Sequence, residues 1–372
     1  MILINGVEIL TVLDDMTWEG AKDIVTRSLS FSFLYNPQVE DMPRYNCKVG
    51  DKVEWIEGDK TLFLGYIEST QYNTDDDSIS ITCQDFASRL ARSKFVGRMQ
   101  GTLNQLANKI CGSFNIKNGI SVDNSHVHNI VSTGDLTYYE VLKTACDTLY
   151  NRYALYMDGD TLRLASHDIQ AAFDTGINIR SSSFNQSLSD MVTRVLVIDN
   201  DGNVLNAVED KENLQKFGLF QETYNYNEDC TNHLAEANKL LKSVENEATI
   251  VTSNLNSCIS GRYIAVNEPI NGLNGVFEII SDNHVIGTDS VMTLEIEYVY
   301  GIKKDKFVEP SSKVEEEIKN TPEGSKAENA EKSIDEYLEE KRKEIENARV
   351  KMIQEMEAQG YYLVNGEWRK ID

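Results

Sequence analysis

Residues 28–33 read Ser-Leu-Ser-Phe-Ser-Phe, a strict period-two pattern. Alternation of this kind puts Leu29, Phe31 and Phe33 on one face of a strand and the three serines on the other. Three large apolar side chains on one face need a second layer to cover them. The stretch therefore predicts a sheet that packs against another sheet or closes into a barrel.

Further strand signals lie on both sides of this stretch. Asn5-Gly6 stands between two short apolar runs, and this dipeptide suits a two-residue hairpin turn. Residues 1–100 are therefore predicted to form a first, tube-like β-barrel domain. Its other strands are predicted at 2–4, 7–9, 52–57, 61–67 and 78–83.

The middle of the chain changes to helical spacing. Thr102 and Thr137 each begin a capping box, with Gln or Glu three residues later and apolar residues at helical spacing beyond. Asp158-Gly159 signals a hairpin after the second helix. Residues 101–180 are therefore predicted to form an α/β insert domain.

Strand patterns return afterwards. Residues 181–305 are predicted to form a second β-barrel domain, interrupted by a helix at about 231–246. The fold class that follows is α+β and mainly β, with two small tube-type barrels and an insert between them. Strands of the second barrel are predicted at 194–198, 249–252, 263–266, 276–280 and 292–298.

Residues 306–372 have a different composition. A linker precedes a charged helix at about 327–358, and a hairpin from Tyr361 to Arg369 follows it. The hairpin is too small to be stable alone and needs a docking surface. The helix has an apolar stripe that binds a partner, folds onto its own chain or belongs to a loosely tethered arm. The stripe consists of Ile334, Leu338, Ile345 and Met352.

Composition excludes several classes of function. The 372 residues carry a formal net charge of −24, which argues against stable binding to nucleic acid or to an anionic membrane. We find no apolar run of the roughly 20 residues that a membrane helix needs and no signal-peptide pattern, so we expect a cytoplasmic product. The six cysteines are dispersed, which favours reduced, packed thiols over a disulfide framework.

Few residues are available for catalysis. His126 and His128 would share a strand face and could bind a metal with Asp123, but no third ligand at a familiar spacing supports such a site, and a polar loop is favoured. His284 is expected to be a hydrogen-bonded structural histidine. We therefore predict no metal site and no cofactor.

Acidic residues give no better candidate for an active site. Asp75–Asp77 are expected to lie in a solvated hairpin loop, because no calcium-loop spacing follows them. Glu68 and Asp85 could be named as glycosidase carboxylates, but acidic residues are too frequent here for the pair to be specific. The glycine patterns of phosphate-binding loops and hydrolase elbows are also missing. No catalytic residue is predicted, and we expect the protein not to be an enzyme.

The order of these domains and three short stretches resemble the baseplate hub proteins of contractile-tailed phages and phage-tail-like bacteriocins, of the late-control-protein-D type. The resemblance covers about residues 1–302. Thr193 departs from it, since such hubs often have Asn there. The stretches are Ile79–Phe86 with Leu90, Asp190–Val195, and Gly261–Val266 through Gly272–Ile279 to His284 and Met292–Leu294.

The resemblance implies a structural role. Such hubs are homotrimers whose two barrels per subunit form a pseudo-sixfold ring between the hexameric tail tube and the threefold central spike. The implied partners are the tube or tube-initiator protein, the spike and other baseplate proteins, with the tape measure as one candidate. The implied location is the bacterial cytoplasm during assembly and then the virion or bacteriocin particle. The acidic excess would keep DNA from sticking to a channel wall.

Two other functions stay open. A tail-tip cell-wall hydrolase would need a clustered catalytic set, which the sequence does not reveal. A receptor- or carbohydrate-binding tail protein would need exposed aromatic platforms, for which Tyr224-Asn225-Tyr226 and Tyr361-Tyr362 are the candidates.

Overall fold

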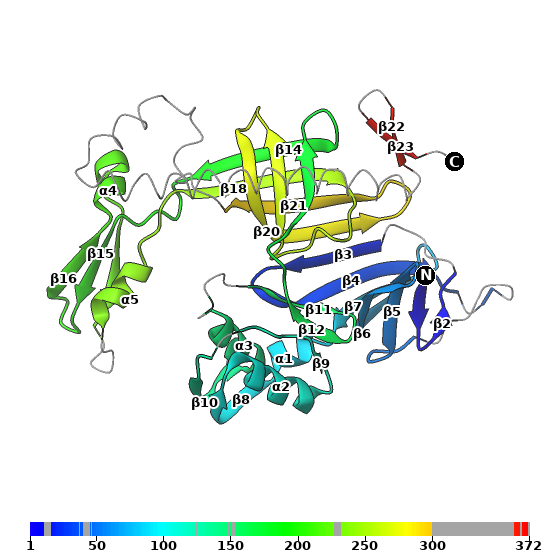
Figure 1. The fold of residues 1–372 in the computed structure, drawn as a ribbon, viewed down its shortest axis with the longest axis horizontal. Helices are drawn as coiled ribbons and strands as arrows, with labels where there is room; N and C mark the ends of the chain where they lie inside the picture. Colours follow the sequence, from blue (N-terminus) through cyan, green and yellow to red (C-terminus); the bar gives the residue numbers. More distant parts are fainter. Residues whose placement is uncertain are drawn as a thin grey trace. The chain divides into compact units, whose positions relative to one another are not determined.

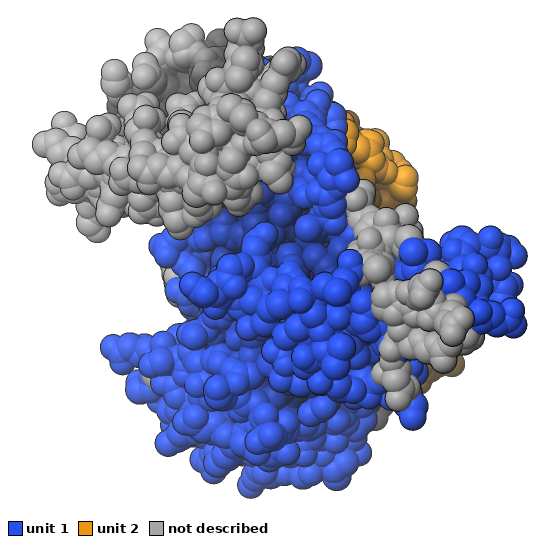
Figure 2. All heavy atoms as spheres, turned by 90° about the vertical axis from the view of Figure 1, so that its right-hand side faces the viewer, with its two compact units in different colours: residues 1–182, 249–372 blue, residues 183–248 orange. Residues whose placement is uncertain are grey.

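The computed structural model describes residues 1–299, apart from 11–15, 37, 40–44, 46, 124, 148, 150–152 and 227–231, together with 361–364 and 367–370. These residues form an α+β fold that is mainly β, as predicted. The chain divides into two compact units, which Figure 2 colours separately. Unit 1 comprises Met1–Ser182 and Thr249–Asp372, and unit 2 comprises Ser183–Ala248.

One sheet of 13 strands lies mostly in unit 1, and its strands β14 and β18 continue into unit 2 (Figure 1). Its main path runs β14-β18-β21-β20-β3-β4-β7-β6-β5-β1-β2, while β19 pairs with β20 and β13 pairs with β19. The strands are β1 (Ile2–Ile4), β2 (Val7–Glu8), β3 (Met16–Ala21), β4 (Ile24–Leu34), β5 (Lys52–Glu57), β6 (Lys60–Asn73), β7 (Ser78–Asp85), β13 (Ile169–Asp174), β14 (Ile179–Ser187), β18 (Glu245–Ser253), β19 (Tyr263–Glu268), β20 (Leu273–Ile286) and β21 (Val291–Tyr298).

The first β region follows the sequence pattern closely. In β4, Leu29, Phe31 and Phe33 are buried, and burial of each such side chain contributes about 1.5–3 kcal/mol to stability. Asn5 and Gly6 form the predicted turn between β1 and β2, both with positive φ (50° and 80°). The alternation thus defines the inner face of this part of the sheet.

Strand β3 joins the two β regions, which we had expected to be separate domains. It pairs antiparallel with β4 on one side and with β20 on the other. The strand was not predicted, because Gly20 breaks an alternation that rests only on Met16 and Trp18. Pairing on both sides removes two exposed sheet edges. The two β regions are therefore parts of one hydrogen-bonded sheet.

The insert has the predicted helices and hairpin. Both capping boxes are present: Thr102 accepts from Gln105 N, and Thr137 accepts from Glu140 N. Gly159 has a positive φ (59°) in the turn of the predicted hairpin. Figure 1 shows the helices gathered beside the short sheets. The elements are α1 (Ser88–Arg92), β8 (Lys94–Gly101), α2 (Leu103–Phe114), β9 (Lys117–Asn118), β10 (His128–Thr137), α3 (Tyr138–Cys146), β11 (Leu155–Asp158) and β12 (Thr161–Leu164).

Unit 2 groups residues differently from the prediction, which placed them inside a second barrel at 181–305. It contains its own three-stranded sheet, in the order β16-β15-β17, with a small core around Val195, Val197 and Ala237. The strand β13, expected in the insert, pairs instead with β19 of the central sheet. The elements of unit 2 are β15 (Arg194–Ile198), β16 (Val204–Glu209), α4 (Lys211–Phe217), β17 (Gln221–Asn225) and α5 (His233–Lys239).

The helix expected at 231–246 is shorter than predicted. It spans only His233–Lys239, with Asn232 as its N-cap. Leu240 and Leu241 continue the apolar spacing but pack on the core of unit 2 from beyond the helix. The spacing of apolar residues does not show where the backbone hydrogen bonds of a helix end. The predicted helix was therefore too long.

The predicted terminal hairpin is present as β22 (Tyr361–Val364) and β23 (Glu367–Lys370), which pair antiparallel. The stripe Ile334, Leu338, Ile345 and Met352 lies outside the described residues. Within the part that the structure describes, no helix is both long enough and apolar enough to cross a membrane.

Candidate functional site

A buried ion pair crosses the central sheet where its two halves meet. Arg27 lies in β4 and Asp282 in β20, and β3 runs between these strands. The Arg27 side chain passes over Gly20 of β3, where an added Cβ would lie 2.4 Å from Arg27 Nη1. Only the missing side chain at Gly20 leaves room for this crossing. Glycine thus stands at the position in β3 where the salt bridge between β4 and β20 crosses the strand.

The pair is made at two points and has further support. Arg27 Nη1 donates to Asp282 Oδ1 at 3.0 Å, and Nη2 donates to Oδ2. The backbone N–H of Ser260 donates to Asp282 Oδ1 at 2.6 Å. His284 Nε2 lies 3.1 Å from Asp282 Oδ2, and His284 Nδ1 is 2.6 Å from Asn254 Oδ1. His284 is thus a hydrogen-bonded structural histidine, as predicted.

Burial strengthens the ionic interactions among Arg27, Asp282 and His284. Arg27 and Asp282 are each 3% exposed, and His284 is fully buried. Burial by itself would raise the pKa of Asp282, but the Arg27 guanidinium and the neighbouring His284 outweigh it and hold the pKa well below its usual value. Asp282 is therefore ionised, and its charge is balanced inside the protein.

Aromatic rings close the site on one side. Arg27 Cζ lies 4.0 Å from the centre of the Trp18 ring, and the Trp18 ring contacts both Trp55 and His284, at 5.4 and 5.1 Å between ring centres. A guanidinium over an indole face gains cation–π attraction that increases when water is excluded. The arrangement fastens two halves of a sheet and keeps the charged groups away from solvent.

Asp85 supports the same arginine from the end of β7. Its carboxylate accepts from the backbone N–H groups of Arg27 (2.9 Å) and Ala87 (3.0 Å). Burial raises the pKa of Asp85 to about 7, although these hydrogen bonds and the Arg27 charge oppose the rise. Glu68, which was not nominated as a catalytic residue with Asp85, pairs with Arg92 at 2.6 Å. The two carboxylates therefore belong to separate structural contacts.

The other candidate residues are dispersed. The His126 and His128 rings are 4.6 Å apart, and His128 begins β10 rather than lying in a polar loop. In the described ranges, three or more metal-binding side chains nowhere come together. Asp75–Asp77 occupy the turn between β6 and β7, as predicted. Tyr226 is 37% exposed, with its ring 4.0 Å from that of His233.

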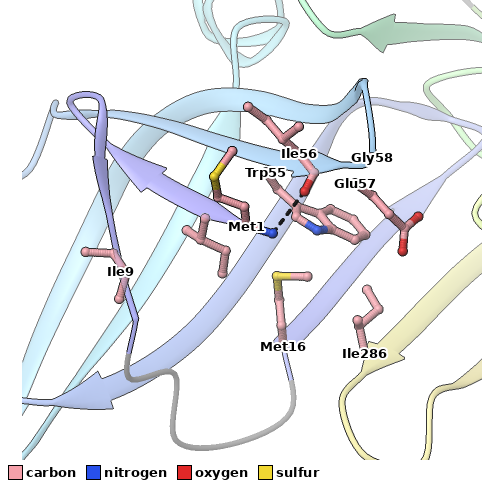
Figure 3. Close-up of a pocket in the computed structure, with 9 residues that line it drawn as sticks. Met1, Ile9, Met16, Trp55, Ile56, Glu57, Gly58 and Ile286 are labelled. Carbon is pink, nitrogen blue, oxygen red and sulfur yellow. Dashed lines mark hydrogen bonds between the residues drawn. The ribbon is translucent and has the colours of Figure 1, made fainter.

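A pocket of about 490 Å³ lies beside the first hairpin. Figure 3 shows residues from β1, β3, β5 and the end of β20 meeting around it. Glu57 contributes one carboxylate, which accepts from Asn256 Nδ2. Met1 contributes the charged amino terminus, which donates to Ile56 O at 2.9 Å. Apolar side chains complete the lining, namely Ile2, Ile9, Met16, Trp55 and Ile286.

Comparison with known families identifies the chain. A family model described as YQBQ-like matches residues 16–297, more than half of the 372 residues. The chain belongs to the YQBQ-like family. The match begins at the start of β3 and ends within β21. In this YQBQ-like chain, the family region therefore includes Arg27, Gly20 and Asp282. No curated protein sequence matches the chain.

Two solved structures have the same fold as this YQBQ-like protein. The 43 kDa tail protein of prophage MuSo2 from Shewanella oneidensis is 17% identical with a TM-score of 0.60, and 79% of this chain and 96% of that chain are covered. The tail protein from Neisseria meningitidis MC58 is 13% identical with a TM-score of 0.58, covering 80% and 95%. At these identities the likeness establishes a fold shared with tail proteins.

One sequence signal would have found part of this site. In β4, Arg27 is an even number of residues from Leu29, Phe31 and Phe33. Its side chain therefore lies on the same, buried face of the strand. A charged residue on such a face needs a buried partner. No local pattern names Asp282, however, because it lies 255 residues away.

Proposed function

We propose that this YQBQ-like protein is a structural baseplate hub of a contractile phage tail or phage-tail-like bacteriocin. In this role three copies form a ring that adapts the sixfold tail tube to the threefold central spike. The observation that carries the proposal is the fold shared with two tail proteins over 95–96% of their length. The family match, which spans both β regions, adds support.

The central sheet suits this role mechanically. Two β regions per chain give six contact surfaces in a trimer, which is the number that a sixfold tube requires. Because β3 and the Arg27–Asp282 pair hold the regions together, each chain would transmit load as one sheet. Arg27, Asp282, His284 and Asp85 are all engaged in internal contacts, which favours a structural over a catalytic role.

The mass of the assembled protein tests the proposal. Native mass spectrometry of the full chain, alone and mixed with the tube and spike proteins of the same particle, should give a trimer that binds both. A chain that stays monomeric in every mixture would contradict the hub. Clearing of a cell-wall zymogram by the purified chain would instead favour the hydrolase.

A further inference from the structure

One face of a two-stranded sheet in the insert is exposed. Strands β8 and β10 pair antiparallel, and three pairs of directly opposed residues share the side that is turned away from the core of the insert. All six of these residues are exposed. We call them the β8–β10 face. The pairs are Val96 with Thr133, Arg98 with Val131, and Gln100 with Asn129.

The opposite side of the same two strands holds this face in place. Phe95 and Ile130 alternate with the face residues along their strands, are 5% and 8% exposed, and belong to the core of the insert. Lys109 of α2 donates to Gln100 O at 3.1 Å, and Ser132 Oγ donates to Phe95 O at 2.8 Å. The backbone of the face is thus fixed before a partner arrives, which reduces the entropy lost on binding.

The β8–β10 face combines an apolar centre with a cation. Val96 is 70% exposed and Val131 is 57% exposed. Because Val131 lies opposite Arg98, it is the diagonal neighbour of Val96, and side chains at such positions interact across a sheet. Arg98 forms no ion pair with any residue that the structure describes. The face therefore suits a partner that offers both apolar side chains and a carboxylate.

The insert differs in charge from the rest of the chain. Residues 88–164, from α1 to β12, contain nine Lys and Arg and six Asp and Glu, which gives a net charge of +3. The remaining residues therefore account for −27 of the total of −24. Opposite charges attract the insert of one copy to the acidic remainder of another. DNA matches the face less well, because the centre of the face is apolar and the chain as a whole repels a polyanion.

We propose that the β8–β10 face docks on an acidic surface of a second copy, outside its residues 88–164, and forms one side of the contact between subunits. This inference rests on the proposed trimer and names part of its interface. A ring needs two different surfaces on each copy that fit each other, and the charge contrast within this chain supplies such a pair. A stable interface buries about 1,200–2,000 Å², so Val96, Arg98 and Val131 would be the centre of a larger contact.

Photo-crosslinking of the full chain tests the contact. A benzophenone amino acid replaces Gln100, at the edge of the face, so that both valines and Arg98 remain. Chains labelled with ¹⁴N and ¹⁵N are mixed before irradiation. We expect mixed-isotope crosslinks from position 100 to residues of the other copy outside 88–164. Crosslinks between two inserts, crosslinks only within one chain, or crosslinks only to DNA, the tube or the spike protein would overturn the inference.

Charge reversal gives a second test. Arg98→Glu should raise the dissociation constant of the trimer at least about tenfold without lowering the unfolding temperature, because the side chain is exposed. Lys60→Glu is the matched control, since it makes the same change of charge at an exposed position of β6, outside the insert. Equal weakening in both variants would reveal a general effect of added negative charge and would overturn the inference.

The apolar centre is tested in the same way. Val131→Asp should also weaken the trimer, whereas Val204→Asp, in β16 and 58% exposed, should not. A trimer that withstands both Arg98→Glu and Val131→Asp would remove the β8–β10 face from the contact and leave the hub intact. A wild-type chain without any trimer would remove both.

Discussion

Arg27 reaches Asp282 by crossing strand β3 over Gly20, so a residue from the first β region neutralises a buried carboxylate of the last. The two residues are 255 positions apart. Backbone hydrogen bonds already join β4 to β3 and β3 to β20, and the ion pair adds a charged contact across the same three strands. Its removal should therefore affect the whole central sheet.

Asp282→Asn leaves the Arg27 guanidinium buried without its counter-charge. Breaking one side of a buried ion pair typically lowers the free energy of unfolding by about 3–5 kcal/mol. We expect a loss of that size in urea unfolding followed by tryptophan fluorescence, because Trp18 stacks on Arg27. In the matched control Asp289→Asn, whose partner Arg180 is partly exposed, the loss should be under about 1 kcal/mol. Equal losses in both variants would mean that the buried pair has no special role.

Gly20→Ala places a methyl group on the path of the Arg27 side chain. Since the new Cβ would lie 2.4 Å from Nη1, we expect the free energy of unfolding to fall by about 1–3 kcal/mol. The loss should largely disappear when Arg27→Ala is made in the same chain, which a double-mutant cycle measures. Gly112→Ala in α2 is the control, because outside the adjacent backbone of its own helix no atom lies within 4 Å of its added Cβ. A loss at Gly20 that is independent of Arg27 would contradict the crossing.

Asp85 should make stability depend on pH. Its folded pKa of about 7 lies above the ordinary 3.8, so the folded protein binds more protons than the unfolded chain between these values. Stability should therefore fall as the pH rises from about 4 to 7 and be level above that, with each unit of pKa difference equal to about 1.4 kcal/mol. Asp85→Asn cannot titrate and should lack this decline. Parallel unfolding profiles for both proteins would refute the assignment.

Asp282 has the opposite pH dependence, because its folded pKa is depressed. Its contribution to stability is complete above the unfolded pKa near 4 and is lost as the pH falls below it. The same series of unfolding experiments, extended to lower pH, should show a decline in the wild-type protein. Asp282→Asn should not share that decline.

The apolar stripe of the predicted helix at 327–358 has three interpretations that one variant separates. If the stripe binds a partner, Leu338→Asp should weaken capture of the tube or spike protein at least about tenfold and leave the unfolding temperature unchanged. If the stripe packs on its own chain, the unfolding temperature should fall instead. If the helix is a loosely tethered arm, neither measurement should change. Glu339→Gln, which lies off the stripe, is the control for both measurements.

Much of the local structure could be predicted from the sequence. The alternation at 28–33, the Asn5-Gly6 turn and the capping boxes at Thr102 and Thr137 are all present. Each depends on backbone geometry over a few residues, so a short stretch contains all the information that it needs. The helix at 233–239 ends before the apolar spacing does, because Leu240 and Leu241 pack on the core of unit 2 from beyond the helix.

The sequence by itself determined local features such as the alternation in β4, the Asn5-Gly6 turn and the two capped helices, because these follow from side-chain spacing and turn chemistry within a few residues. Only the tertiary structure decided that β3 lies between β4 and β20, and that Arg27, Gly20 and Asp282 meet there. Arg27 lies on the buried face of its strand, which shows that it needs a partner, but the partner is far away in the chain. A contact between residues some 250 positions apart produces no repeating pattern in the sequence of either segment. It forms only when the sheet brings the two segments together.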